Sequence, residues 1–107
     1  MSDPQPSSAQ RLIGGFAPKL VELTDGVLFG DVWKRDGLSA RDRSLVTITA
    51  LVAGGNVEQL PFHLKLGVEN GLTRDEIVET ITHLAFYSGW PKAMSAITTA
   101  KETLASG

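Results

Sequence analysis

Apolar residues recur at helical spacing along most of the chain, between polar caps and glycines that mark helix ends. In residues 39–55, Ser39 is a predicted N-cap, Asp42 lies in the expected first turn, and Gly54-Gly55 closes the segment. Its apolar residues share one face: Leu45, Ile48, Leu51 and Val52. The β-branched run at 45–49 would also fit a short strand, but the length of the periodic segment favours a helix.

The C-terminal third of the chain carries two further helix patterns. Thr73 and Glu76 form a predicted capping box, and Gly89 ends that helix. Its expected apolar face consists of Ile77, Ile81, Leu84 and either Tyr87 or Ser88. Pro91 suits the first turn of the last helix. The expected face of that helix consists of Met94, Ile97, Ala100 and Leu104.

Residues 56–71, NVEQLPFHLKLGVENG, form another helical segment, and it contains a histidine at the margin of the apolar face. At 3.6 residues per turn, one stripe contains Gln59, His63, Gly67 and Asn70. Pro61 removes a backbone hydrogen bond and distorts the first turns unless the helix begins late. Gly67 removes side-chain bulk one turn after His63. The combination resembles a small pocket, and the alternative is an ordinary half-buried histidine.

Weaker signals precede these helices. Residues 17–35 read as two short helical pieces broken at Gly26 or Gly30, and residues 1–9, which are almost without apolar side chains, are expected to be a disordered leader. No period-2 pattern predicts strands. The sequence therefore predicts an all-α domain over residues 10–105, with about five to six helices joined by short connections.

Composition restricts the classes of function. The 107 residues carry a net charge of −2 without a basic stripe, which argues against nucleic acid as a partner. No apolar run approaches the roughly 20 residues that span a bilayer, and no signal peptide is evident, so a cytoplasmic protein without membrane contact is expected. The absence of cysteine excludes thiol chemistry, and two histidines make a metal site unexpected. A helical domain of this size is expected to self-associate.

Seven side chains could contribute to a site. His63 is the group that titrates near pH 7 within its helix, and Glu58 is the nearest carboxylate in sequence. The other side chains that could line a site are Trp33, Arg41, Arg43, His83 and Tyr87. Each also has a structural interpretation: the arginines as solvated charges near a helix cap, Trp33 as a packing anchor, and the last two as part of an amphipathic face.

Three stretches together resemble the carboxymuconolactone decarboxylase family: WKRDGLSARDRSLVTITALVAGG, EQLPFHLKLGVENGLTRDEIVETI and AFYSGWPKAMSAITTAKE. The resemblance covers residues 29–102. It implies an AhpD-like helical domain that assembles through helix packing into a trimer or hexamer. The peroxidase branch has cysteines seven and four residues before the histidine. This chain has Asn56 and Gln59 there, so thiol peroxidase activity is not expected.

The decarboxylase branch retains the histidine, followed by the leucine, asparagine and glycine that match Leu64, Asn70 and Gly71. It commonly has Glu four residues before the histidine, where this chain has Gln59. Glu58 lies one residue away, about 140° around a regular helix from His63. A proton relay through Glu58 therefore requires the turn at Pro61 to be distorted.

The resemblance implies a lyase that needs no cofactor and acts on a small lactone or organic acid. Loss of CO₂ leaves an electron pair that the conjugated lactone carbonyl accepts, and a proton donor and an oxyanion partner complete the reaction. It implies His63 as proton donor, Arg41 or Arg43 as carboxylate or oxyanion partner, and Trp33, His83 and Tyr87 as the wall. The alternative is a module of the same family that binds a ligand or assembles without catalysis.

Overall fold

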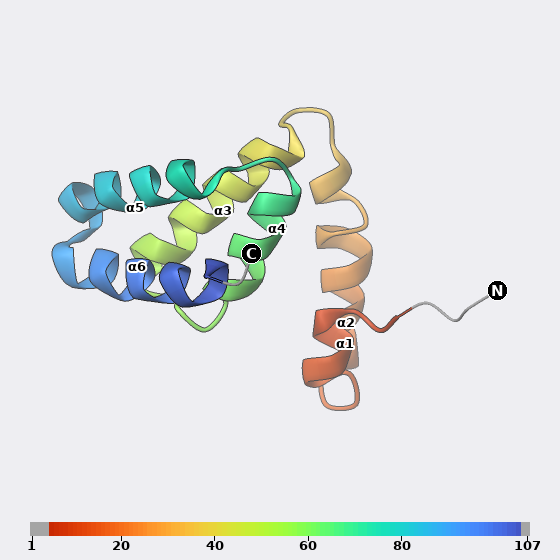
Figure 1. The fold of residues 1–107 in the computed structure, drawn as a ribbon. Coiled ribbons are helices and arrows are strands. Elements are labelled where there is room, and N and C mark those ends of the chain that lie inside the picture. Colours follow the sequence, from red (N-terminus) through yellow and green to blue (C-terminus); the bar gives the residue numbers. More distant parts are fainter. Residues whose placement is uncertain (1–4, 106–107) are drawn as a thin grey trace. The chain divides into compact units, whose positions relative to one another are not determined.

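The computed structural model describes residues 5–105, and all regular elements in this range are helical (Figure 1). The all-α prediction is confirmed. The chain divides into two compact units, residues 1–37 and residues 38–107. No helix within the described residues is long and apolar enough to cross a membrane.

The N-terminal unit consists of short helical pieces. They are α1 (Ser8–Ile13), α2 (Pro18–Glu22), the π-helical η1 (Leu23–Leu28) and the 3₁₀-helical η2 (Val32–Lys34). The helical path continues through Gly26 and is interrupted by the turn that contains Gly30, which decides between the two expected break points. Residues 1–4 of the expected leader lie outside the described residues, and α1 begins within its last two positions.

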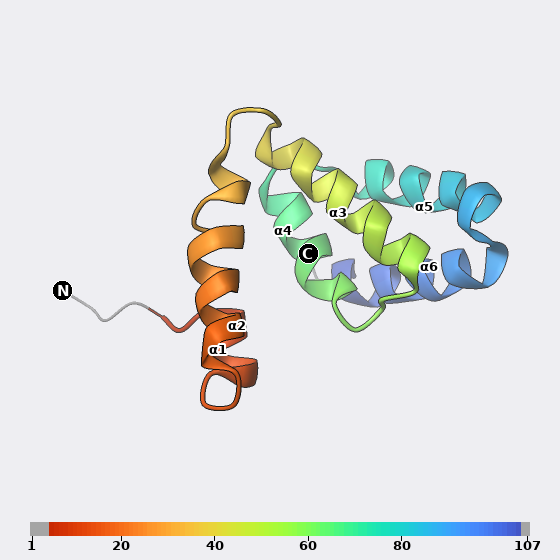
Figure 2. The same cartoon turned by 180° about the vertical axis from the view of Figure 1, so that it is seen from behind.

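The C-terminal unit contains the four longest helices. They are α3 (Ala40–Gly54), α4 (Leu60–Glu69), α5 (Arg74–Ser88) and α6 (Trp90–Leu104). The helices α5 and α6 form an antiparallel hairpin, and α3 lies across it and packs against α4 (Figures 1 and 2). Gly89 alone joins the two hairpin helices, with φ 101° and ψ 146°, a backbone conformation that is almost confined to glycine.

Local capping explains where these helices begin. The Ser39 hydroxyl accepts a hydrogen bond from the Asp42 backbone N–H at 3.0 Å. The Glu76 N–H donates to the Thr73 hydroxyl at 3.0 Å, while the Thr73 N–H donates to the Glu76 carboxylate at 2.9 Å. The N-cap at Ser39 and the capping box are thus confirmed, and each satisfies N–H groups that a helix start leaves without a partner.

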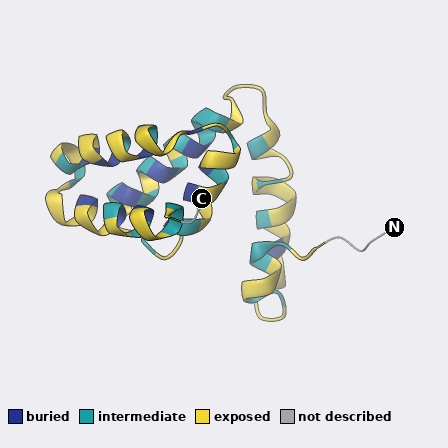
Figure 3. Ribbon diagram, viewed as in Figure 1, coloured by how far each residue is buried: buried dark blue, intermediate teal, exposed yellow. Residues whose placement is uncertain are grey.

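The core of this unit is built from the inward faces of all four helices (Figure 3). Its largest fully buried side chains are Ile48, Val52, Leu60, Leu64, Ile77 and Ile81. The expected α5 face continues with half-buried Ser88 and not with Tyr87, which is 77% exposed. The α6 face was predicted in part wrongly: Met94 is 52% exposed, because α6 turns its small residues Ala93, Ala96 and Ala100 to the core.

The helix α4 begins later than the sequence pattern indicates, after turns at residues 57–59. Pro61 therefore occupies the first turn, where no intrahelical hydrogen bond needs its missing N–H, so the late start that the sequence left open applies and α4 is not distorted there. Gly67 also differs from the prediction. A β-carbon there would lie 3.0 Å from Leu72 Cδ1 and 3.1 Å from Ile48 Cδ1, so this glycine permits close packing on the core rather than leaving a gap.

Candidate functional site

His63 lies in the first turns of α4, two residues after Pro61. Its side chain is half-buried, its Nδ1 atom is shielded from solvent, and its ring meets the Phe62 ring edge to face with centroids 5.0 Å apart. Burial disfavours the charged imidazolium and lowers the pKa of His63 below its ordinary value of 6.5. The neutral imidazole therefore predominates at pH 7, and its protonated form is a stronger acid than an exposed histidine.

Glu58 lies in the turn that precedes α4, and its side chain is exposed. Within residues 5–105, the structure records no hydrogen bond or ion pair for its carboxylate. Gln59, at the N-cap position, is also exposed and makes no side-chain capping bond. The proton relay from Glu58 to His63 stays a prediction. The distortion of the turn at Pro61, which this relay required, is not present.

Arg41 is held by two carboxylates. Its guanidinium donates hydrogen bonds to Asp42, at 2.9 Å, and to Glu76 on α5. The hydrogen bond to Glu76 is the main cause that raises the pKa of Arg41. The pKa of Glu76 is lowered, first by the hydrogen bond from the Thr73 backbone N–H and second by the hydrogen bond from Arg41. Arg41 thus joins the beginning of α3 to the beginning of α5, and its charge is already balanced.

Arg43 lies on the same helix as Arg41 and in a different setting. Its side chain is half-buried and its Nε atom is shielded from solvent. Charged side chains are seldom buried in proteins unless they are paired. The Nε atom of Arg43 is thus shielded from solvent, whereas the guanidinium of Arg41 donates to two carboxylates.

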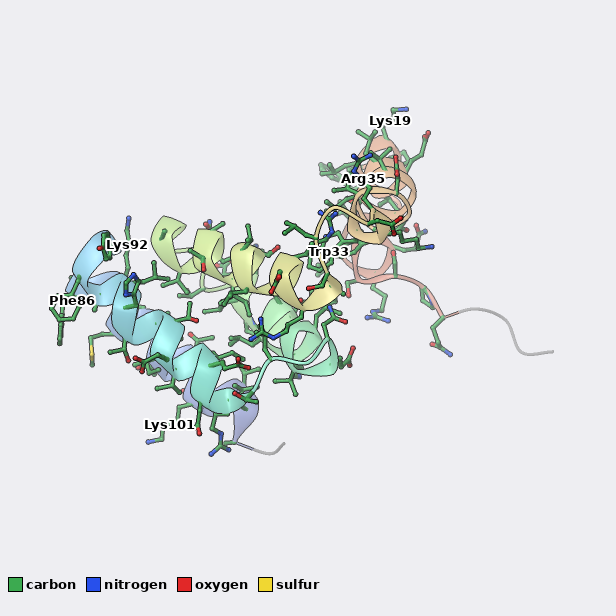
Figure 4. The ribbon with its side chains drawn as sticks, turned by 90° about the horizontal axis from the view of Figure 1, so that it is seen from above. Lys19, Trp33, Arg35, Phe86, Lys92 and Lys101 are labelled. Carbon is green, nitrogen blue, oxygen red and sulfur yellow. The ribbon has the colours of Figure 1, made fainter. Side chains whose placement is uncertain are left out.

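The three proposed wall residues do not share one setting. Trp33, which is labelled in Figure 4, belongs to the N-terminal unit. Its ring stacks on that of Phe29 with centroids 5.7 Å apart. His83 and Tyr87 stack on each other with centroids 4.8 Å apart, as their spacing of four suggests, but both are exposed on α5. Phe86, labelled at the end of the hairpin in Figure 4, is 78% exposed beside them.

A polar contact between α3 and α4 escapes detection from sequence. Ser44 is fully buried, and the Asn70 side-chain amide donates to its hydroxyl at 3.0 Å. The position of Asn70 on the stripe of His63 was visible in the sequence, but the partner on α3, 26 residues earlier, was not.

An open groove of about 490 Å³ lies between α5 and α6. Its lining is mostly apolar and consists of Arg74, Val78, Ile97, Ala100, Lys101, Leu104 and Ala105. None of the seven predicted site residues lines it. Across the described residues 5–105, no three or more His, Asp or Glu side chains are grouped so as to hold a metal ion.

Comparisons with known proteins give relatives for most of the chain. The 4-carboxymuconolactone decarboxylase of Acinetobacter baylyi is 43% identical over 74 residues, which cover 69% of this chain and 55% of that protein. The nitrosuccinic acid decarboxylase npaB of Metarhizium robertsii is 32% identical over 83 residues, covering 78% of this chain and 58% of that protein.

An uncharacterized 15.0 kDa protein of Paracoccus denitrificans is 33% identical over 79 residues, which cover 72% of this chain and 59% of that protein. The chain thus spans little more than half the length of these relatives. The sequence model of the carboxymuconolactone decarboxylase family matches residues 18–102. With the helical fold, that match and the identity to two decarboxylases show that the chain belongs to the carboxymuconolactone decarboxylase family.

Proposed function

We propose that this chain is a decarboxylase that removes CO₂ from a small organic acid whose carboxylate lies on a carbon from which an electron pair can be delocalised onto an electron-accepting oxygen group. Two relatives support this class of substrate, because one is named for a lactone acid and the other for a nitro acid. A lactone carbonyl and a nitro group both accept an electron pair on oxygen. The proposed reaction therefore requires an oxyanion partner and a proton donor from the protein.

The proposed step balances without an oxidant or reductant. The bond between the substrate carbon and the carboxylate breaks, and CO₂ leaves. The electron pair of that bond stays with the substrate and is delocalised onto the acceptor oxygen. The imidazolium of His63 then protonates carbon, and solvent water reprotonates the imidazole. Proton transfer by a positioned side chain typically accelerates a reaction by about 10² to 10⁴.

Arg43 is the preferred partner for the carboxylate or the developing oxyanion. Its shielded Nε atom supports this choice, because electrostatic stabilisation is strongest where water is excluded. Arg41, whose guanidinium donates to Asp42 and Glu76, is the alternative partner.

The proposed wall consists of Trp33, His83 and Tyr87. The last two are exposed in the single chain, so we infer that a further copy of the chain covers them when they exclude water from a substrate. The proposal therefore includes a homo-oligomer, a trimer or hexamer as the family resemblance implies. Glu58 is the proposed relay partner of His63.

The observation that carries the proposal is the half-buried imidazole of His63, with its lowered pKa, in a chain of a decarboxylase family. The test is CO₂ release from 4-carboxymuconolactone and from nitrosuccinic acid, in D₂O to detect solvent deuterium on product carbon. His63→Gln is expected to lose about 10² to 10⁴ in rate. Lys65→Gln, an exposed change on the same helix, is the control and should keep the rate.

A His63→Gln protein with the full rate would remove His63 from the mechanism. Absence of CO₂ release by the unchanged chain, from both acids at pH values from about 5 to 8, would favour the second candidate function. That candidate is a ligand-binding or assembly module of the same family, and the exposed position of Glu58 favours it. Thiol peroxidase activity has no support, because the chain contains no cysteine.

A further inference from the structure

Ser44 is a buried polar residue within an otherwise apolar core. It is 0% exposed, and Asn70, which is half-buried at the end of α4, donates its side-chain N–H to the Ser44 hydroxyl at 3.0 Å. A hydrogen bond between two side chains is directional, whereas the hydrophobic effect is not. The contact therefore adds a directional restraint on how the C-terminal end of α4 is turned against α3.

Asn70 and His63 lie on the same side of α4. Seven residues separate them, which is two turns within about 20°. Gly67 lies between them, and its side faces α3, because a β-carbon at Gly67 would lie 3.7 Å from Ser44 Cβ and 3.1 Å from Ile48 Cδ1. The stripe that contains His63 is thus the stripe by which the C-terminal half of α4 is seated on α3.

We propose that Ser44 and Asn70 are a positioning pair for His63, holding α4 at the rotation and depth that set the place of the imidazole. The effect of the position of the imidazole on turnover rests on the proposed function. The structural restraint on α4 does not depend on that function. Neither residue is proposed to contact substrate. Their effect passes through α4 to His63.

The leverage follows from helix dimensions. Side-chain atoms lie about 6 Å from the helix axis, so a rotation of about 10° displaces them by about 1 Å. A displacement of this size at a reacting group can lower the rate about 100-fold. The same rotation alters how far the imidazole is shielded from water, and this makes the titration of His63 a second, independent readout.

The experiment compares Ser44→Ala, Asn70→Ala and the double variant in the full chain. Ser44→Ala keeps the β-carbon that packs near Gly67 and removes one hydroxyl oxygen, so it tests the hydrogen bond with little change in packing. Thr49→Ala is the matched control. Thr49 also lies on α3, but its hydroxyl donates at 2.8 Å to the Leu45 carbonyl of its own helix and not to another helix.

Each single variant is expected to raise the pKa of His63, followed by NMR titration, toward its ordinary value of 6.5. Each should lower kcat about tenfold or more with a smaller change in KM, and the double variant should add little to either single change. Thr49→Ala should leave both readouts as they are in the unchanged chain.

An unchanged His63 titration in folded Ser44→Ala and Asn70→Ala proteins would overturn the positioning role. A fall in kcat that only follows the folded fraction, measured by circular dichroism, would overturn it as well. If the unchanged chain releases no CO₂ from either acid, the proposed function fails. In that case the NMR titration alone still decides whether the pair positions His63.

Discussion

Replacing Gly67 by alanine tests the close packing of α4 on the core. The added β-carbon would meet Leu72 Cδ1 at 3.0 Å and Ile48 Cδ1 at 3.1 Å, both shorter than ordinary van der Waals contact. These neighbours are 2% and 0% exposed, so neither side chain can move out into solvent. The methyl group must therefore displace α4 or strain the core.

Two opposing effects set the magnitude. Overpacking a core by one carbon costs about 1 to 3 kcal/mol, and replacing glycine by alanine within a helix returns about 1 kcal/mol. The expected net loss is about 1 kcal/mol, which lowers Tm by about 4 to 8 °C in a domain of this size. The control is Gly26→Ala in η1, where a β-carbon meets nothing within 4 Å and the helical gain should remain.

Thermal unfolding followed by circular dichroism measures both variants. Ile48→Val removes the Cδ1 atom that the new methyl group would approach, so Gly67→Ala should cost at least about 0.5 kcal/mol less in that background. A Gly67→Ala protein as stable as the unchanged chain, or more stable, would refute the argument. It would return Gly67 to the earlier expectation of a gap beside the imidazole.

Three further predictions concern Pro61, pH and assembly. Pro61→Ala is expected to lower the free energy of unfolding by about 0.4 to 1 kcal/mol, because Pro61 restricts the unfolded chain at no cost in hydrogen bonds. A variant that urea unfolding shows to be more stable would contradict the position of Pro61 in the first turn. Burial lowers the pKa of His63, so His63 binds a proton more readily in the unfolded chain than in the folded one. The free energy of unfolding, measured in urea titrations, should therefore fall as the pH drops through 6.5. A His63→Gln protein with the same pH dependence would assign that dependence to other groups. Light scattering at low micromolar concentration is expected to show a mass well above 11.4 kDa, since Phe86, Tyr87 and Trp90 are more than half exposed, and a single species of that mass would contradict self-association.

Local signals made most of the fold predictable. Ser39 and Thr73 fix the beginnings of α3 and α5 through hydrogen bonds that span three residues, so neither depends on distant parts of the chain. The position of His63 at the margin of the apolar face also followed from helical spacing, and its side chain is half-buried. Predictions of this kind succeed because the interacting groups are close in sequence.

The failures arise where packing decides. Apolar character favoured Met94 for the α6 face, but close approach to the core selects Ala93 and Ala96. Gly67 was interpreted as missing bulk, and only the positions of Leu72 and Ile48 show that the space is filled. The hydrogen bond between Ser44 and Asn70 and the engagement of Arg41 by Glu76 depend in the same way on which helices meet.

The one-residue connection at Gly89 bears on the order in which the chain folds. Closing a loop costs more conformational entropy as the loop lengthens, and α5 and α6 are separated by a single residue. The contacts between α5 and α6 are local in sequence and are expected to form early, before α3 packs across the hairpin. A few flexible residues inserted beside Gly89 should therefore slow folding, whereas the same insertion in the turns at 55–59 should mainly affect the docking of α4.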